Sequence, residues 1–125
     1  MPEFLLVVAA GGVGAMARHE LDALLSQHST RFPVGIFLVN VIGSFVLGLV
    51  VGLHAAGDLP TRWLTIVGVG LCGGFTTFST AAVDAARLAG ARRWIAFAWQ
   101  WLGMFVACVA FGLVGYWLGA LGANP

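Results

Sequence analysis

Four apolar stretches, at residues 4–25, 33–55, 63–88 and 94–121, take up most of this 125-residue chain. Each is longer than the roughly 20 apolar residues that an α-helix needs to cross a bilayer. Only short polar connections remain between them. The sequence therefore predicts an all-α membrane protein with four transmembrane helices, built as a single four-helix transmembrane domain over residues 1–125. The N-terminus lacks the basic region of a signal peptide, so we expect the first stretch to remain a spanning helix.

The composition excludes several other classes of protein. Charged residues form 9% of the chain, whereas soluble domains carry about 25%, and the mean hydropathy is +0.97. Six arginines, no lysine and five acidic residues give a net charge of +1, so we expect membrane lipid and no nucleic acid as a partner. Cys72 and Cys108 lie inside apolar stretches and lack the spacing of a metal site. Because the sequence holds no catalytic triad, paired carboxylate or Walker loop, we predict that it is not an enzyme.

Glycines recur at the spacing that lets membrane helices pack closely. Gly48 and Gly52 are four residues apart, as are Gly115 and Gly119. They could pack helices within one subunit or form an interface between subunits. Since a bundle of four helices is too thin to enclose a polar pathway alone, we expect the chain to form an oligomer.

The densest polar group in the apolar stretches is Gly-Gly-Phe-Thr-Thr-Phe-Ser-Thr, at residues 73–80. Gly73 lies ten residues after Trp63, about 15 Å along a helix and so near the bilayer midplane. Adjacent glycines followed by β-branched and hydroxyl residues form helices poorly. We therefore expect the third helix to break here, which frees backbone groups to meet protein, water or an ion. The alternative is a continuous helix whose hydroxyls bond to carbonyls one turn earlier.

Two further polar residues lie within the apolar stretches. Asn40 shares a helix face with Gly43 and Ser44 and offers two N–H donors and one acceptor; it could be a functional donor or make an interhelical packing bond. Arg18 lies about 21 Å along the first helix and could extend to the headgroups or attract anions into a vestibule. Near the end of the third stretch, Asp84 could line a pore mouth or pair with Arg87.

Three segments of the chain match a known family in order and spacing. They are Gly-Gly-Val-Gly-Ala-Met-Ala-Arg at 11–18, Pro-Val-Gly-Ile-Phe-Leu-Val-Asn-Val-Ile-Gly-Ser-Phe at 33–45, and Gly-Leu-Cys-Gly-Gly-Phe-Thr-Thr-Phe-Ser-Thr at 70–80. With them, the chain resembles the Fluc (CrcB) family of small fluoride channels. The match covers the first three helices, while the fourth agrees only as an apolar, glycine-rich span.

The resemblance implies an antiparallel dimer of four-helix subunits in a bacterial or archaeal plasma membrane, with the third helix broken near the midplane. It implies two narrow pores along the dimer interface and a structural sodium ion at the dimer centre. Backbone carbonyls of the broken helix would hold that ion, here those of Gly73 and Thr76. This is reasonable chemistry, because a hard cation prefers oxygen ligands.

The resemblance also assigns residues to the fluoride path. They would be Asn40, Thr77, Phe78, Ser79 and Thr80, with Arg18 at the vestibule. Amide and hydroxyl donors and the positive edge of the Phe78 ring would replace the water that a fluoride ion loses. A narrow pore would exclude the larger chloride ion.

Position 81 departs from the family pattern, in which a second phenylalanine follows; here the residue is Ala81. Without this aromatic residue, two hypotheses remain open: a fluoride-exporting channel, and a non-conducting or half-pore partner in a heterodimer. Phe75 could replace the missing ring in space. A small multidrug-type exporter is a weaker alternative. That mechanism needs a carboxylate within the first helix, whereas Glu3 and Glu20 lie at its two ends.

The arginines are unevenly distributed between the two ends of the predicted bundle. If both termini face one side, only Arg62 lies there, and five face the other: Arg18, Arg31, Arg87, Arg92 and Arg93. The positive-inside rule then predicts termini outside the cell. A dual-topology homodimer needs little bias, so the arginines and Ala81 together indicate an oppositely oriented paralogue as an alternative partner.

Overall fold

A computed structural model describes residues 2–27 and 33–123 of the chain, and their regular structure is entirely helical. Four helices there are long and apolar enough to cross a membrane: Pro2–Ser26, Val34–Ala55, Thr61–Gly90 and Trp94–Ala120. The prediction of an all-α protein with four spanning helices is confirmed, and the chain is a multi-pass membrane protein. Arg31, which contributes to the charge argument above, lies outside the described residues.

The first two spans are single helices, and the last two are composite. The first two are α1 (Pro2–Ser26) and α2 (Val34–Ala55). The third span comprises α3 (Thr61–Trp63), a π-helical segment η1 (Leu64–Cys72), α4 (Gly73–Phe75) and α5 (Ser79–Gly90). The fourth comprises α6 (Trp94–Ala98), a second π-helical segment η2 (Trp99–Gly103), α7 (Met104–Ala120) and a final 3₁₀ turn η3 (Leu121–Ala123).

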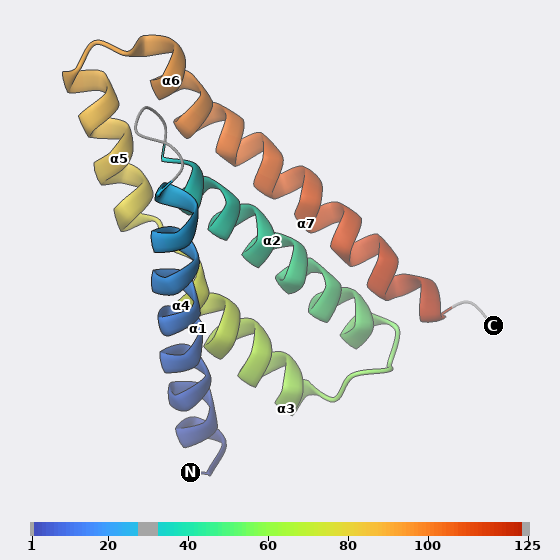
Figure 1. Ribbon diagram of the computed structural model, residues 1–125. Coiled ribbons are helices and arrows are strands. Elements are labelled where there is room, and N and C mark those ends of the chain that lie inside the picture. The colour runs from blue at the N-terminus through green and yellow to red at the C-terminus, as the bar shows by residue number, and fades with distance from the viewer. Residues whose placement is uncertain (1, 28–32, 124–125) are drawn as a thin grey trace.

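The four spans alternate in direction (Figure 1). The two ends of the chain and the connection from α2 to α3 lie at one end of the molecule, and the connection from α5 to α6 lies at the other. Arg62 therefore belongs to the end with the termini, and Arg92 and Arg93 to the opposite end.

Glycines join α2 to α7, the most closely packed pair of helices in the fold. A Cβ atom added at Gly48 would meet the backbone of Gly112, and one added at Gly115 would meet the backbone of Phe45. Gly52 and Gly119 make the same kind of backbone approach across this seam. All four glycines are therefore used for packing within one subunit, the first of the two interpretations given above.

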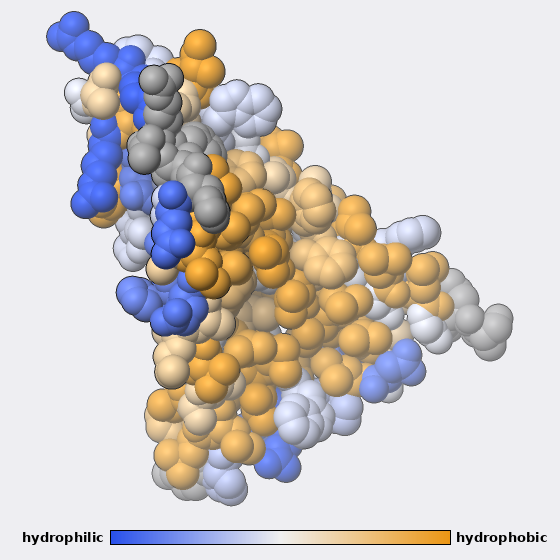
Figure 2. All heavy atoms as spheres, in the orientation of Figure 1, coloured by the Kyte–Doolittle hydropathy of each residue, from blue (hydrophilic) through white to orange (hydrophobic). Residues whose placement is uncertain are grey.

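The described interior is small, and most large apolar side chains face outward. One buried cluster joins Ile36, Ala81 and Met104, with Phe37 and Cys108 packed against it. Hydrophobic side chains cover the middle of the face seen in Figure 2, and hydrophilic ones gather toward its ends. This distribution suits a bilayer, because lipid tails are as apolar as the side chains that they contact.

Candidate functional site

The third span is interrupted at residues 76–78, between α4 and α5. Thr76 is extended, with φ −82° and ψ 157°. The predicted break is therefore present, but it follows the two glycines, which stay helical. Gly74 serves close packing instead, since a Cβ there would meet the carbonyl of Gly11 in α1. At the last turn before the break, the Thr76 hydroxyl donates to the Cys72 carbonyl at 2.9 Å, the back-bonding expected of a continuous helix.

Asn40 of α2 pairs with the peptide groups of Thr77 in the break. Its Oδ1 accepts a hydrogen bond from the Thr77 N–H at 2.8 Å, and its Nδ2 donates to the Thr77 carbonyl at 2.9 Å. Nδ2 also donates to the Met104 sulfur at 3.2 Å. The side chain is buried. Asn40 thus makes the interhelical packing bonds considered above, and they satisfy backbone groups that the break removes from the helix.

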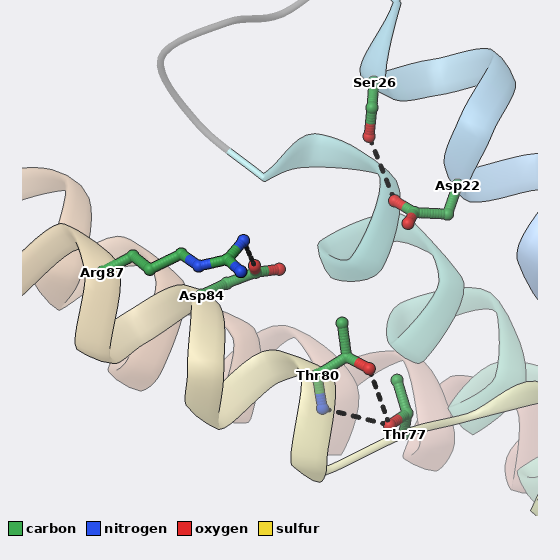
Figure 3. A network of polar contacts seen from close by, with 6 residues as sticks. All are labelled: Asp22, Ser26, Thr77, Thr80, Asp84 and Arg87. Carbon is green, nitrogen blue, oxygen red and sulfur yellow. Dashed lines mark hydrogen bonds and ion pairs between the residues drawn. The ribbon is translucent and has the colours of Figure 1, made fainter.

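The hydroxyl of Thr77 caps the start of α5. Its Oγ1 accepts from the Thr80 N–H at 3.3 Å and lies 3.5 Å from the Thr80 hydroxyl (Figure 3). It also lies 3.3 Å from the Ser79 hydroxyl. Thr77 lies one residue before Phe78, the N-cap residue of α5, which has no capping side chain, and the Thr77 hydroxyl accepts from one of the free N–H groups of the first turn. Threonines and serine at the break therefore stabilise the second half of the broken helix.

Arg18 reaches the break from α1, where its Nη1 donates to the Thr76 carbonyl at 3.4 Å. In contrast, the backbone at Gly73 is exposed, and nothing lies within 4 Å of a Cβ added there. No three His, Cys, Asp or Glu side chains in the described ranges are grouped to hold a metal. Backbone carbonyls such as those of Gly73 and Thr76 have the oxygen chemistry that a hard cation prefers.

An open groove of about 750 Å³ runs beside the break, between α2 and the fourth span. Five of the sequence-predicted site residues line it: Asn40, Gly73, Thr76, Thr77 and Phe78. Ser44 adds a hydroxyl from α2. Ser79, Thr80 and Arg18 are not in the lining. Ser79 and Thr80, at the start of α5, contact Thr77, and Arg18 of α1 contacts Thr76. The groove thus brings together the α2 face and the break that the sequence singled out.

Phe78 projects into this groove and is 75% exposed. Its ring centroid lies 5.9 Å from that of Trp101, with the planes inclined by 58°. Ala81 also lines the groove, but it is 3% exposed and packs into the small buried cluster. Phe75 is not in the lining and packs beside Gly43. The aromatic neighbour of Phe78 therefore comes from the fourth span, where the sequence analysis identified no site residue.

Two residues of the fourth span were missed, Trp101 and Met104. The available signal was Gln100, the polar residue inside the last apolar stretch. Gln100 is fully buried, and neither its Nε2 nor its Oε1 finds a hydrogen-bond partner in the described part of the chain. Because η2 is π-helical, the side chains around Gln100 do not follow the 3.6-residue period that a sequence reading assumes.

Asp84 and Arg87 lie on α5 beyond the break, one turn apart (Figure 3). Their closest charged atoms are 4.0 Å apart, and the Asp84 side chain is mostly covered while Arg87 is largely exposed. The expected pair is confirmed. An ion pair with one exposed partner contributes little to stability, so its main effect is to fix where the Asp84 carboxylate lies.

Comparison with known proteins identifies the family of this chain. The profile of the family described as CrcB-like protein, Camphor Resistance (CrcB), matches residues 5–120. The chain belongs to the CrcB family. The match therefore extends over all four spans, including the fourth, and leaves out only the first three residues of α1.

Curated CrcB relatives are similar over nearly the whole chain. "Fluoride-specific ion channel FluC 1" of Leifsonia xyli is 49% identical over 123 residues, which cover 97% of this chain and 89% of the relative. "Fluoride-specific ion channel FluC 2" of Cutibacterium acnes is 42% identical over 93% of this chain and 96% of the relative. The FluC 1 protein of Geobacillus kaustophilus is 39% identical over 94% and 92%. These names describe ion channels rather than enzymes.

Proposed function

We propose that this chain is a subunit of a fluoride-selective channel, which lets fluoride leave the cytoplasm passively. The observation that carries the proposal is the open groove at the helix break, in a CrcB chain whose relatives are named fluoride-specific ion channels. Passive conduction needs no proton-coupling carboxylate. The acidic residues of α1 lie near its two ends, which disfavours the multidrug-type exporter.

Asn40 is suited both to holding the break and to donating to an anion. One of its N–H groups meets the Thr77 carbonyl, while the other meets the thioether of Met104. A thioether sulfur is a weak acceptor, so a fluoride ion in the groove would compete for that second N–H easily. In this proposal Asn40 keeps its two hydrogen bonds to Thr77. Its other N–H donates to fluoride in place of the Met104 sulfur.

Trp101 supplies the second aromatic ring that the family pattern has at position 81. The Trp101 ring centroid lies 5.9 Å from that of Phe78, and both rings line the groove together with Ala81. Aromatic rings carry positive charge along their edges. Two ring edges and the hydroxyls of Ser44 and Thr77, which line the groove, would together stabilise a dehydrated fluoride ion without a fixed positive charge that would trap it.

A second, inverted copy would complete the pore by covering the groove, as the resemblance implies. The exposed backbone at Gly73 and the exposed ring of Phe78 support an interface at this face. A sodium ion between the copies would take carbonyls of Gly73 and Thr76 from each. Arg18 donates to the same Thr76 carbonyl, so we expect the ion and the guanidinium to share that oxygen through its two lone pairs.

Fluoride efflux from liposomes that contain only this chain tests the function. With a fluoride-selective electrode, we expect rapid efflux of fluoride and none of chloride when the membrane potential is clamped by a potassium ionophore. Protein-free liposomes are the control. A chain that inserts and dimerises in liposomes yet releases no fluoride would contradict the proposal and favour a half-pore partner.

One observation favours a heterodimer as a second candidate. Arg87, Arg92 and Arg93 lie at one end of the fold and Arg62 at the other, a bias that favours one orientation. Relatives are named both FluC 1 and FluC 2, which is consistent with two such chains in one organism. The partner would then be an oppositely oriented paralogue.

Cysteine labelling separates the two assemblies. Single cysteines at Gln27 and at the C-terminus, in a chain with Cys72 and Cys108 replaced by alanine, would be treated with a membrane-impermeant maleimide on intact cells. Comparable labelling at both positions indicates a dual-topology homodimer. Labelling at the C-terminus alone indicates a single orientation and a heterodimer.

A further inference from the structure

A second hollow, of about 930 Å³, lies at the turn between the third and fourth spans. It shares no lining residue with the groove at the break. Its lining comprises Phe37 of α2, Arg92 and Arg93 of the turn, and Trp94, Ile95, Ala96 and Trp99 of the fourth span. The hollow therefore combines two adjacent arginines with an apolar and aromatic wall, at the end of the molecule away from the termini (Figure 1).

The turn that presents the arginines is a Schellman motif. The Arg93 N–H donates to the Leu88 carbonyl at 2.9 Å, and the Arg92 N–H donates to the Ala89 carbonyl at 3.0 Å. Arg92 occupies the left-handed position of this motif, with φ 57°, and no other non-glycine residue among those described has a positive φ. Glycine is the favoured residue there. The turn would thus form at least as well without the Arg92 side chain, so local folding does not explain the arginine.

The described lining of the hollow is positively charged. It includes Arg92 and Arg93 and no acidic residue. Arg92 is exposed and has no ion-pair partner in the described part of the chain. The site therefore attracts a ligand of net negative charge.

The apolar wall fixes the depth of the hollow in the membrane. Trp94, Ile95 and Trp99 are 60%, 80% and 63% exposed, and side chains so apolar face lipid in a spanning helix. Tryptophan at the end of a span favours the level of the headgroups, and arginine side chains reach the same level. The two guanidinium groups therefore lie where lipid phosphates lie.

We propose that this hollow binds the headgroup of an anionic phospholipid. The phosphate lies between the Arg92 and Arg93 side chains, because a guanidinium matches phosphate oxygens with two parallel N–H donors. The acyl chains extend along Ile95 and Trp99. The site favours a lipid whose headgroup carries no charge beyond its phosphate, or carries a second negative charge. A zwitterionic headgroup suits it less, since no acidic side chain lines the described part of the hollow to receive an ammonium group. The inference does not depend on fluoride conduction.

The test is the thermal unfolding of the purified full-length chain in a neutral detergent, with dioleoyl phosphatidylglycerol or dioleoyl phosphatidylcholine added. We expect phosphatidylglycerol to raise the unfolding midpoint by several degrees and phosphatidylcholine to have little effect. Arg92→Gly removes the charge while giving the turn its favoured residue, so it should keep the lipid-free stability and lose about half or more of the lipid-induced shift. Arg92→Lys should retain most of the shift. The matched control is Arg62→Ala, which removes an exposed arginine beside Trp63 at the other end.

Four outcomes would overturn the proposal. Equal shifts with phosphatidylcholine would remove the requirement for an anionic lipid, and an equal shift with millimolar inorganic phosphate would assign the site to free phosphate. An equal loss in Arg62→Ala would mean that any arginine attracts the lipid. A full shift in Arg92→Gly would show that the turn does not bind it. Should Arg92→Gly fail to fold, Arg92→Asn replaces it, because asparagine also tolerates the left-handed position, and native mass spectrometry of bound phosphatidylglycerol gives the readout.

Discussion

Asn40 connects α2 to the break through a single amide group. Its two bonds to the Thr77 peptide replace the helical hydrogen bonds that the chain loses there. A buried backbone group without a partner costs about 1–3 kcal/mol, and water is scarce at membrane depth to take over. The sequence could suggest Asn40 as a candidate donor, but not its partner, since the register of the break against α2 depends on tertiary packing.

We therefore expect Asn40→Ala to lower stability by about 1–3 kcal/mol, because two partly buried backbone groups of Thr77 lose their partner, and to abolish fluoride efflux. Thermal unfolding and the liposome assay measure the two effects. Ser44→Ala, one turn along the same face of α2, is the matched control and should unfold like the wild type. Wild-type stability of Asn40→Ala would mean that the Thr77 peptide needs no partner.

Phe78 and Trp101 form the aromatic pair of the groove. We expect Trp101→Leu to reduce fluoride efflux at least about tenfold, because the ring edge is lost while the apolar volume is largely kept. Trp117→Leu changes another exposed tryptophan, at the far end of α7, and should conduct normally. If Ala81→Phe restores efflux to Trp101→Leu, the two positions supply the same ring. Unchanged efflux in Trp101→Leu would remove this tryptophan from the path.

At Gln100 we predict a substitution that raises the stability of the protein. A fully buried amide without a partner is unfavourable, and methionine has a similar shape. We expect Gln100→Met to raise the free energy of unfolding by about 1–2 kcal/mol, measured by thermal or denaturant unfolding in detergent. A loss of stability would reveal that Gln100 acquires a hydrogen-bond partner in the assembled protein.

At the scale of elements, the third span was predictable in outline and not in detail. Hydropathy located the span, and the run of glycine, threonine and serine located the break to within a few residues. The packing role of Gly74 was missed, however, because a sequence does not reveal that Gly74 faces the Gly11 carbonyl. The π-helical segments η1 and η2 could not be predicted from the sequence either. They shift side chains away from the 3.6-residue period on which helix faces are predicted.

The adjacent glycines of α4 give a matched pair of variants. Gly74→Ala inserts a methyl group against the Gly11 carbonyl, and overpacking of this kind costs about 1–3 kcal/mol, so the subunit itself should lose stability. Gly73→Ala meets nothing within 4 Å, so the subunit should fold normally. If a second copy packs at the break, Gly73→Ala should instead reduce the fraction of dimer, measured by cross-linking in liposomes. Normal dimerisation of Gly73→Ala would argue against an interface at this carbonyl.

At the scale of the whole molecule, the fold has little interior of its own. The resemblance correctly predicted the family and the four spans. It also implies a partner on the groove face, which stays a prediction. One subunit leaves the broken helix open on one side. We therefore expect most of the free energy of the proposed association to come from covering that face.

A sodium ion between two breaks would make the assembly depend on the cation present. We expect the dimer to unfold at a lower temperature when sodium is replaced by N-methyl-D-glucamine at equal ionic strength, and the fluoride-path variant Phe78→Ile to keep this dependence. Gly73→Ala, which adds a methyl group beside the proposed carbonyl ligand, should weaken this dependence. Identical unfolding of the wild type in the two salts would exclude a stabilising sodium ion.

The glycine seam between α2 and α7 also has a consequence for how this chain changes over evolutionary time. On one side of α7, Gly115 and Gly119 touch the backbone of α2 and admit no larger residue. Elsewhere on α7, Phe111, Leu113 and Trp117 are more than half exposed, and a lipid-facing position accepts one apolar residue as readily as another. We therefore expect substitutions to accumulate slowly at the glycines of α7, which have no side chain, and faster at its exposed apolar positions.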